Sequence, residues 1–395
     1  MTNTEFKIGI VGAGAMGAGI AQVAAGAGHR VIIFDTNNAI LVSAQKKLDR
    51  ILNRLIEKQR ISEINAELLM GRINWVNQLT DLSESKLIIE AIVENLAIKK
   101  SVFSELETLV HEDCILASNT SALSIAAISS ACKKKDRVMG IHFFNPAPLM
   151  PLVEVIPAIG TDQNLIEQVV ELMKQWGKIP VVAKDTPGFI VNRIARPFYG
   201  EALRIYEEGW EGIAEGHVGF ATIDWAMREV GGFRMGPFEL MDYIGNDINY
   251  AVTESVFTSF FYDPRYRPSI IQKRYSEAGW LGRKSGQGYY DYSENANAPE
   301  AVKDMVLGQK IVNRILCLLI NEAVDALYLR IAHTDDIELA MTLGVNYPKG
   351  LLDWGKEIGY DKVLGQINTL HQLYTEERYR PSQLLIKWAE TMNNQ

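Results

Sequence analysis

The sequence has few cysteines and no surplus of positive charge. Its 395 residues include three cysteines, Cys114, Cys132 and Cys317, which match neither a disulfide framework nor the spacing of a zinc site. We therefore expect a reducing compartment and no bound metal. The formal net charge is -8, from 40 basic and 48 acidic side chains. Nucleic acid is not an expected partner, because domains that bind it usually carry a basic surplus.

The sequence also lacks a stretch typical of a targeting signal or a membrane span. Residues 1–7 contain no basic region followed by an apolar one. The apolar stretch 8–27 is rich in glycine and alanine, and a predicted turn at Gly12 interrupts it. We expect a cytoplasmic protein without a membrane partner, folded into two or three domains.

A glycine-rich turn near the N-terminus predicts a dinucleotide site. Residues 7–11 are typical of a strand, residues 18–27 of a helix and residues 31–34 of a second strand. The run between the first strand and the helix is Gly12-Ala13-Gly14-Ala15-Met16-Gly17. In this G-x-G-x-x-G pattern the first glycine permits a tight turn, the second permits close approach of a pyrophosphate, and the third permits close packing of helix on sheet.

Asp35 closes the second strand, where its carboxylate can accept a hydrogen bond from a ribose 2′-hydroxyl. Residues 36–38 contain no arginine for a 2′-phosphate, so the pattern favours NAD over NADP. The alternative is a tight structural turn that binds nothing.

Strand and helix patterns continue to alternate up to about residue 186. We predict a doubly wound, mostly parallel α/β Rossmann domain over residues 1–186, with a helical hairpin inserted near 39–72. On this hairpin, Lys46, Arg50, Arg54 and Lys58 recur every four residues and form a basic stripe. The stripe is either a solvated helix face or a clamp for the phosphates of a bulky anionic substrate.

The remainder of the sequence is helical and repeats itself. Val191-Asn192-Arg193-Ile194 recurs as Val312-Asn313-Arg314-Ile315, and Arg265-Tyr266-Arg267-Pro268-Ser269 recurs as Arg378-Tyr379-Arg380-Pro381-Ser382. The order of the repeated segments is kept, so we predict an all-α domain duplicated in tandem, over residues 187–292 and 301–395, with a polar linker at 293–300.

His142 and Glu154 are candidates for general acid–base chemistry. His142 closes a predicted strand, and Glu154 lies within the next one, which is otherwise apolar. A carboxylate that accepts a hydrogen bond from one imidazole nitrogen fixes the tautomer and makes the other nitrogen more basic. The alternative for His142 is a satisfied core histidine.

The motifs together resemble the L-3-hydroxyacyl-CoA dehydrogenase family. The resemblance runs in order from residue 8 to about 292. It is carried by the glycine-rich turn, Glu90-Ala91-Ile92-Val93-Glu94-Asn95, Ser118-Asn119-Thr120-Ser121, His142-Phe143-Phe144-Asn145-Pro146, Asp185-Thr186-Pro187-Gly188-Phe189-Ile190-Val191-Asn192-Arg193, Met235-Gly236-Pro237-Phe238-Glu239-Leu240 and Gly282-Arg283-Lys284-Ser285-Gly286-Gln287-Gly288-Tyr289-Tyr290.

The resemblance implies NAD-dependent oxidation of a 3-hydroxyacyl-CoA in a cleft between the first two domains. It makes His142 the base and Glu154 the carboxylate that orients it. Ser121 then binds the substrate's 3-oxygen, and Asn192 positions the substrate. Relatives serve fatty acid β-oxidation, butyrate metabolism and aromatic degradation. The other implied contacts are Glu94, Lys99, Ser121, Asn145 and Lys284 with the cofactor, and Arg54, Lys58 and Lys99 with CoA.

The sequence departs from the family in three places. Ala122 stands where many relatives have a second serine, and Ile51 stands where some place a serine near CoA. The second helical copy is truncated, and we expect it to be structural. Many relatives dimerise through a single helical domain, so a fused copy can replace the partner and leave a monomer.

Two other functions remain open at this point. An NAD-dependent dehydrogenase of a non-CoA 3-hydroxy acid, such as a sugar acid, would use the same base. A non-catalytic NAD-binding protein would be expected to lose His142, Glu154 or Ser121, and all three are present. A dehydrogenase resembling those of 6-phosphogluconate would use a lysine base, for which no motif is found.

Overall fold

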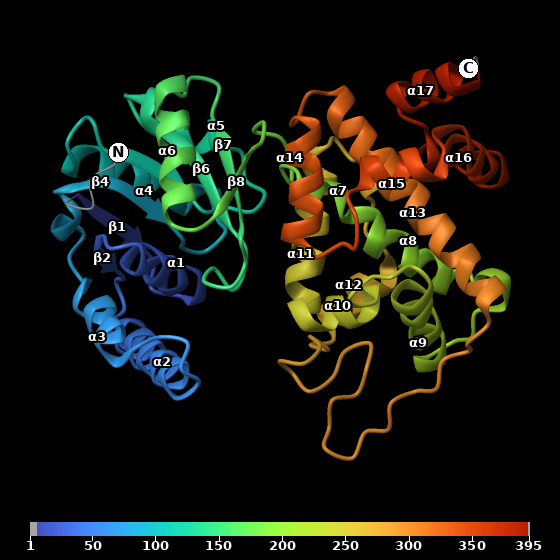
Figure 1. Cartoon of the computed structure of the whole chain (residues 1–395), viewed down its shortest axis with the longest axis horizontal. Helices are drawn as coiled ribbons and strands as arrows, with labels where there is room; N and C mark the ends of the chain where they lie inside the picture. Colours follow the sequence, from blue (N-terminus) through green and yellow to red (C-terminus); the bar gives the residue numbers. More distant parts are fainter. Residues whose placement is uncertain (1–5, 394–395) are drawn as a thin grey trace. The chain divides into compact units, whose positions relative to one another are not determined.

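The computed structural model describes residues 6–393, which divide into two compact units between Thr186 and Pro187 (Figure 1). The first unit is built on an eight-stranded sheet in the order β3-β2-β1-β4-β5-β6-β7-β8. Strands β1 to β6 are parallel, β7 is antiparallel to β6, and β8 is parallel to β7. The strands are β1 (Lys7–Val11), β2 (Arg30–Phe34), β3 (Ile73–Val76), β4 (Ser85–Glu90), β5 (Ile115–Ser118), β6 (Val138–Phe143), β7 (Leu152–Pro157) and β8 (Ile179–Val182).

Helices cover both faces of this sheet, which explains why its strands are apolar on both sides. Ile8 and Ile10 of β1 pack with α1, α2, α3 and α6 on one face, whereas Val11 of the same strand packs with α4 and α5 on the other. The predicted doubly wound α/β class is confirmed. The helices are α1 (Ala15–Gly26), α2 (Asn38–Glu57), α3 (Glu63–Gly71), α4 (Leu96–Leu109), α5 (Ile125–Ser129) and α6 (Gln163–Gln175).

The second unit is helical, as predicted, and its longest helix is α13. This helix contacts α8 and α9 of the first predicted helical segment as well as α15, α16 and α17 of the second. The two segments therefore form one compact unit. Its helices are α7 (Val191–Ile194), α8 (Arg196–Glu207), α9 (His217–Trp225), α10 (Pro237–Ile244), α11 (Asn246–Ser259), α12 (Ile270–Glu277), α13 (Met305–Tyr328), α14 (Thr334–Leu339), α15 (Leu351–Ile358), α16 (Tyr360–Tyr374) and α17 (Gln383–Asn393), with π-helical turns η4 (Ala226–Val230) and η6 (Ala340–Gly344).

Buried ion pairs join the two segments. Glu322 on α13 accepts hydrogen bonds from Arg193 Nε (2.7 Å) and the Tyr266 hydroxyl (2.5 Å), and Arg265 Nη1 lies 3.3 Å from its other oxygen. Burial opposes ionisation of Glu322, but the two arginines outweigh it and hold the pKa of this carboxyl below its usual value.

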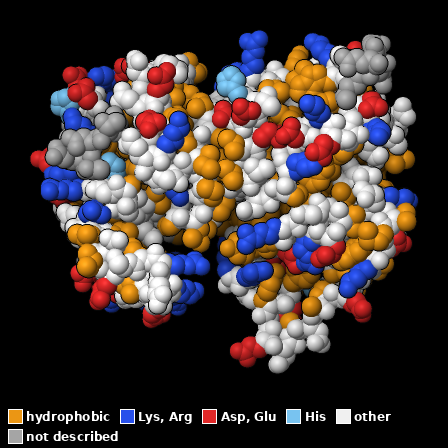
Figure 2. Space-filling model, in the orientation of Figure 1, with side chains coloured by type: hydrophobic (Ala, Val, Ile, Leu, Met, Phe, Trp, Pro, Cys, Tyr) orange, Lys and Arg blue, Asp and Glu red, His pale blue; other side chains and the backbone are white. Residues whose placement is uncertain are grey.

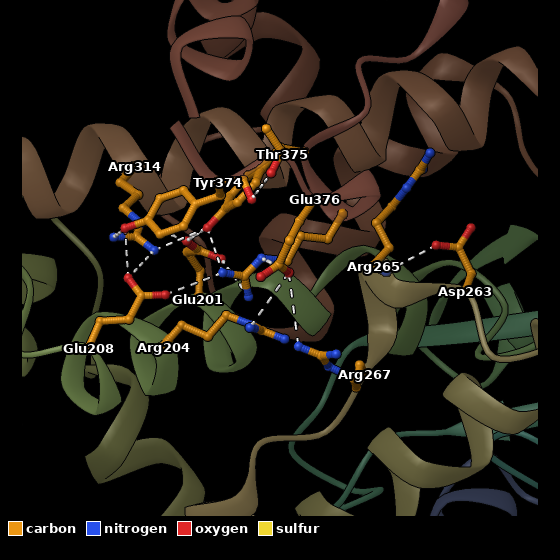
Figure 3. Close-up of polar contacts among 12 residues, drawn as sticks. Glu201, Arg204, Glu208, Asp263, Arg265, Arg267, Arg314, Tyr374, Thr375 and Glu376 are labelled. Carbon is orange, nitrogen blue, oxygen red and sulfur yellow. Dashed lines mark hydrogen bonds and ion pairs between the residues drawn. The ribbon is translucent and has the colours of Figure 1, made fainter. Parts of the chain in front are cut away.

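A second cluster repeats this arrangement with the segments exchanged. Glu201 on α8 accepts hydrogen bonds from Arg314 Nε (2.6 Å) and the Tyr379 hydroxyl (2.8 Å), and Arg378 Nη1 lies 3.8 Å away. Figure 3 shows part of this cluster, in which Glu208 and Tyr374 also meet Arg314. Each buried carboxylate is thus paired with arginines of the other segment.

Glu322→Gln should destabilise the helical unit strongly, because it leaves Arg193 and Arg265 buried without their shared carboxylate. The expected loss at pH 7 is about 3–5 kcal/mol of unfolding free energy, measured by urea unfolding. Since the folded pKa of Glu322 is lowered, its stabilisation is present above the carboxyl's unfolded pKa and is lost as the pH falls through the folded value. The difference in unfolding free energy between the variant and the wild type should therefore become smaller as the pH is lowered.

The control for this prediction is Glu277→Gln, which removes an exposed partner of Arg274. Exposed pairs contribute about 0–1 kcal/mol. Equal unfolding free energies for the two variants would contradict the interpretation of the buried cluster.

Candidate functional site

The glycine-rich turn has the geometry that a dinucleotide requires. Gly12 has a φ of +100°, and a Cβ there would lie 2.7 Å from the Ala91 carbonyl oxygen. A Cβ on Gly17 would lie 1.8 Å from the Gly12 carbonyl oxygen, so helix α1 can pack this closely only on a glycine. A Cβ on Gly14 would meet no protein atom within 4 Å. The backbone at Gly14 is therefore open to a ligand, beside the uncapped N-terminus of α1.

Asp35 lies directly beside this turn. Its Oδ2 accepts a hydrogen bond from Ala13 N and its Oδ1 accepts one from Asn37 N, each at 2.9 Å. Each carboxylate oxygen keeps a further lone pair for a hydroxyl donor. Ala15, which is exposed, and Met16, which is half-buried, follow Gly14 on the first turn of α1.

Buried polar groups connect the carboxyl ends of β4 and β5. Glu90, the last residue of β4, is completely buried, and its Oε1 accepts a hydrogen bond from Lys99 Nζ at 2.6 Å. Its Oε2 accepts a hydrogen bond from Ser118 Oγ at 2.7 Å. Lys99 Nζ also lies 3.3 Å from Glu94 Oε2. Glu90 and Ser118 were not among the predicted site residues; a carboxylate at the end of an apolar strand was the signal that could have found Glu90.

Glu94 extends this network to Ser121. Glu94 Oε1 accepts hydrogen bonds from Thr120 Oγ1 (2.6 Å), Ser121 N (3.0 Å) and Ser121 Oγ (3.3 Å). The loop after β5 is therefore held in place by a carboxylate from the loop after β4. Lys99 contacts the two glutamates, and its predicted contacts with the cofactor and with CoA stay predictions.

His142 and Glu154 face each other across the antiparallel pair β6 and β7. They are register partners, and His142 Nδ1 lies 2.6 Å from Glu154 Oε2. His142 is 6% exposed and Glu154 is completely buried. An ionised carboxylate only accepts hydrogen bonds, so Nδ1 carries the proton and Nε2 has a lone pair that can take a proton.

Two further contacts hold the segments next to His142. Asn119 Oδ1 accepts a hydrogen bond from Phe143 N at 2.7 Å, which ties the loop after β5 to β6. The buried Lys178 donates from Nζ to the carbonyls of Ala147 (2.6 Å) and Met150 (2.8 Å), and burial lowers the pKa of this lysine. These contacts fix the loop that begins with the exposed Asn145. Sequence reasoning missed Asn119 and Lys178, because their partners are backbone groups of distant segments.

The remaining predicted residues lie on other surfaces. Arg54 and Lys58 are exposed at the C-terminal end of α2, together with Lys46 and Arg50 on the same helix. Figure 2 shows blue side chains gathered at one end of the α2–α3 hairpin, in the lower left of the view.

Asn192 and Lys284 belong to the helical unit. Asn192 lies on α7, and Lys284 Nζ donates to Asp247 Oδ1 at 2.6 Å. Their contacts with substrate and cofactor stay predictions.

Within residues 6–393, no group of three or more His, Cys, Asp or Glu side chains is arranged to hold a metal ion. None of the helices described is long and apolar enough to cross a membrane.

Comparison with known proteins assigns the family. The model of the 3-hydroxyacyl-CoA dehydrogenase NAD-binding domain matches residues 7–186, and that of the C-terminal domain of the same enzymes matches residues 188–292 and 311–394. The chain is 36% identical to 3-hydroxyadipyl-CoA dehydrogenase of Escherichia coli K12, over 98% of this chain and 97% of the relative. It is 40% identical to a probable 3-hydroxybutyryl-CoA dehydrogenase of Deinococcus radiodurans, over 73% of this chain and 100% of the relative.

A crystal structure of 3-hydroxybutyryl-CoA dehydrogenase from Escherichia coli K12 superposes with a TM-score of 0.91, at 35% identity, and covers 99% of each chain. The chain thus belongs to the 3-hydroxyacyl-CoA dehydrogenase family, as an NAD-dependent oxidoreductase that acts on a CH–OH group.

Proposed function

We propose that this protein oxidises L-3-hydroxyacyl-CoA to 3-oxoacyl-CoA, with His142 as the general base and Glu154 as the residue that positions it. The observation that carries the proposal is the 2.6 Å contact between His142 Nδ1 and a completely buried Glu154 carboxylate. A buried carboxylate is costly unless it is hydrogen-bonded, and here its partner is the imidazole. This arrangement leaves Nε2 as the proton-accepting nitrogen.

The proton and the hydride leave the substrate by separate routes. His142 Nε2 removes the proton from the 3-hydroxyl group, and the positive charge that results is stabilised by Glu154. NAD, when bound, supplies the nicotinamide that accepts the hydride from C3. In the reverse direction the imidazolium returns its proton to the developing alkoxide. The Ser121 hydroxyl, which donates to Glu94 Oε1 in this structure, would turn to donate a second hydrogen bond to that oxygen.

The residues of the first unit fit the cofactor. Gly14 leaves the backbone open for the pyrophosphate, next to the first N–H groups of α1, and the Asp35 carboxylate can accept from a ribose hydroxyl. Glu94 fixes the loop that carries Ser121. The further cofactor contacts proposed for Asn145, Lys99 and Lys284 rest on the family resemblance.

A CoA thioester is proposed as substrate because of the basic stripe on α2. Lys46, Arg50, Arg54 and Lys58 are exposed, and no ion pair joins them to an acidic side chain within residues 6–393. A phosphate-bearing ligand would supply the missing negative charge. The names of the relatives, which act on hydroxyadipyl-CoA and hydroxybutyryl-CoA, agree with a thioester substrate. Asn192 is proposed to bind the same substrate.

We also infer that the two helical segments are copies of one domain that pair within the chain. The matched family model covers both segments. Glu322 is contacted by Arg193 and Tyr266 of the first segment, and Glu201 is contacted by Arg314 and Tyr379, which occupy the corresponding positions of the second segment. Such a pairing has the self-complementary character of a two-fold dimer interface, and it supports a monomeric protein.

Replacement of the base tests the mechanism. His142→Ala should lower kcat for oxidation of L-3-hydroxybutyryl-CoA by about 10²–10⁴-fold, since that is the usual contribution of a general base. Glu154→Gln should lower kcat by a smaller factor and leave the KM for the thioester nearly unchanged. Steady-state kinetics at saturating NAD provide both values.

The matched control is Glu107→Gln, since Glu107 is another carboxylate of the first unit and accepts hydrogen bonds from Lys133 N and Lys134 N. It should change stability and not kcat. Wild-type kcat in Glu154→Gln, or in His142→Ala, would refute the assigned roles.

Removal of basic side chains tests the phosphate clamp. Arg54→Ala and Lys58→Ala should each raise the KM for acetoacetyl-CoA several-fold, with little change in kcat, because remote phosphate contacts bind ground state and transition state alike. The KM for acetoacetyl-N-acetylcysteamine, which has no phosphate, should not change. Lys47→Ala on the same helix is the control. An equal rise for both thioesters would show that the stripe does not bind phosphate.

The mass in solution tests the intramolecular pairing. We expect sedimentation equilibrium at micromolar concentration to give 44.2 kDa, the mass of a single chain. A concentration-independent mass of twice that value would show that the second copy does not replace a partner.

A further inference from the structure

Glu90 is a buried carboxylate of the first unit that the proposed mechanism does not use. It is the last residue of β4 and is completely buried. Its Oε1 accepts hydrogen bonds from Lys99 Nζ (2.6 Å) and Ile92 N (2.8 Å), and its Oε2 accepts one from Ser118 Oγ (2.7 Å). Both oxygens act as acceptors, as those of an ionised carboxylate do. A buried charge is costly unless it is paired and hydrogen-bonded, and these three partners hold it in one position.

Lys99 connects Glu90 to a second carboxylate, which lies at the surface. The Lys99 side chain is 1% exposed, and its Nζ lies 2.6 Å from Glu90 Oε1 and 3.3 Å from Glu94 Oε2. The Glu94 side chain is 41% exposed. Two carboxylates thus share a single ammonium group, so one negative charge is left uncompensated. Because the contact with Glu90 is shorter and lies in the interior, the uncompensated charge belongs to the exposed Glu94.

Glu94 in turn holds Ser121. Its Oε1 accepts hydrogen bonds from Ser121 N (3.0 Å) and Ser121 Oγ (3.3 Å). Ser118, three residues earlier in the same loop, is bound directly to Glu90. The stretch 118–121 is therefore fixed at its start by Glu90 and at its end by Glu90 through Lys99 and Glu94.

The main chain of Glu90 makes contacts that are separate from those of its side chain. Its carbonyl accepts a hydrogen bond from Asn119 N at 2.7 Å, and Asn119 Oδ1 accepts one from Phe143 N, next to His142. These contacts do not involve the carboxylate and are kept when the side chain is replaced. Replacement of the carboxylate therefore removes the support of Ser121 and leaves the link to the strand of His142.

We propose that Glu90 is a positioning residue for the Ser121 hydroxyl and acts on it through the hydrogen bonds described. The proposal rests on the proposed function, in which Ser121 donates to the 3-oxygen of the substrate. Without the charge of Glu90, Lys99 pairs with Glu94 alone and draws that carboxylate toward the interior. Glu94 then loses its alignment with the loop, and Ser121 Oγ is displaced from the substrate oxygen. A displacement of about 1 Å in an active site can cost about 10²-fold in rate.

The test is a double-mutant cycle of Glu90→Gln and Ser121→Ala, in oxidation of L-3-hydroxybutyryl-CoA with the thioester and NAD each varied. Ser121→Ala alone should lower kcat by about 10²-fold, as for the loss of one donor to a developing oxyanion. Glu90→Gln alone should lower kcat by at least about tenfold and leave the KM for NAD nearly unchanged. In the Ser121→Ala background, Glu90→Gln should change kcat by less than about twofold, because the hydroxyl that it positions is absent.

The matched control is Glu107→Gln. Glu107 lies on α4, the helix that carries Lys99; it accepts hydrogen bonds from Lys133 N and Lys134 N and lies 3.9 Å from Arg137 Nη2. Its replacement also removes a carboxylate that is paired with a cation in the first unit. It should lower the midpoint of thermal unfolding and leave kcat unchanged with and without Ser121.

The cycle separates positioning of Ser121 from a general structural role. Wild-type kcat in Glu90→Gln overturns the proposal, and so does an equal loss of kcat with and without Ser121. A rise in the KM for NAD at unchanged kcat also overturns it, since the side chain would then support the glycine-rich turn. Should Glu90→Gln fail to fold, Ser118→Ala takes its place in the cycle, and equal losses in the two backgrounds overturn the proposal. An unchanged kcat in Ser121→Ala itself, or no turnover of the thioester by the wild type, would contradict the proposed function instead.

Discussion

The contact between His142 and Glu154 is the interaction on which the proposed acid–base chemistry depends. It exists because β7 runs antiparallel to β6 and places the two residues opposite each other in the register. The rest of the sheet is parallel up to β6, so the strands β1, β4 and β5 all end at the same edge as β6. The glycine-rich turn, the loop of Glu94 and the loop of Ser121 follow those strand ends. Because β7 is antiparallel, it brings the Glu154 carboxylate to the same edge of the sheet as the predicted cofactor-binding loops.

Carboxylates from distant segments organise both units. In the first unit, Glu90 and Glu94 connect the ends of β4 and β5, and Asp185 accepts hydrogen bonds from Ile125 N (2.9 Å) and Ala126 N (2.7 Å) at the start of α5. In the second, Glu201 and Glu322 neutralise buried arginines of the opposite segment.

The strands and most of the candidate site could be predicted from the sequence because their signals are local. Apolar runs predicted strands such as β1 and β2, and glycine spacing predicted the turn at Gly12, whereas β3 was not predicted. The positions of His142 and Glu154 on consecutive predicted strands made them candidates, and the resemblance then assigned their roles. The partners of Lys178 and Asn119 could not be predicted, since both bind backbone groups more than twenty residues away, as in the Phe143 N to Asn119 contact across 24 positions.

The repeats in the helical part predicted a second copy in the place of a dimer partner, and they did not predict which residues meet. In the structure both segments belong to one compact unit and contact the same helix, α13. A pocket lined by Phe198 and Tyr347 is formed only by this packing.

The most direct test of the central claim is NADH oxidation by the wild-type protein with acetoacetyl-CoA, measured beside free acetoacetate and a 3-oxo sugar acid. We expect rapid turnover of the CoA thioester and none of the free acids. Turnover of the free acids alone would contradict the assignment of a CoA substrate. Binding of NADH without turnover of any of the three would contradict the assignment of His142 as a working base.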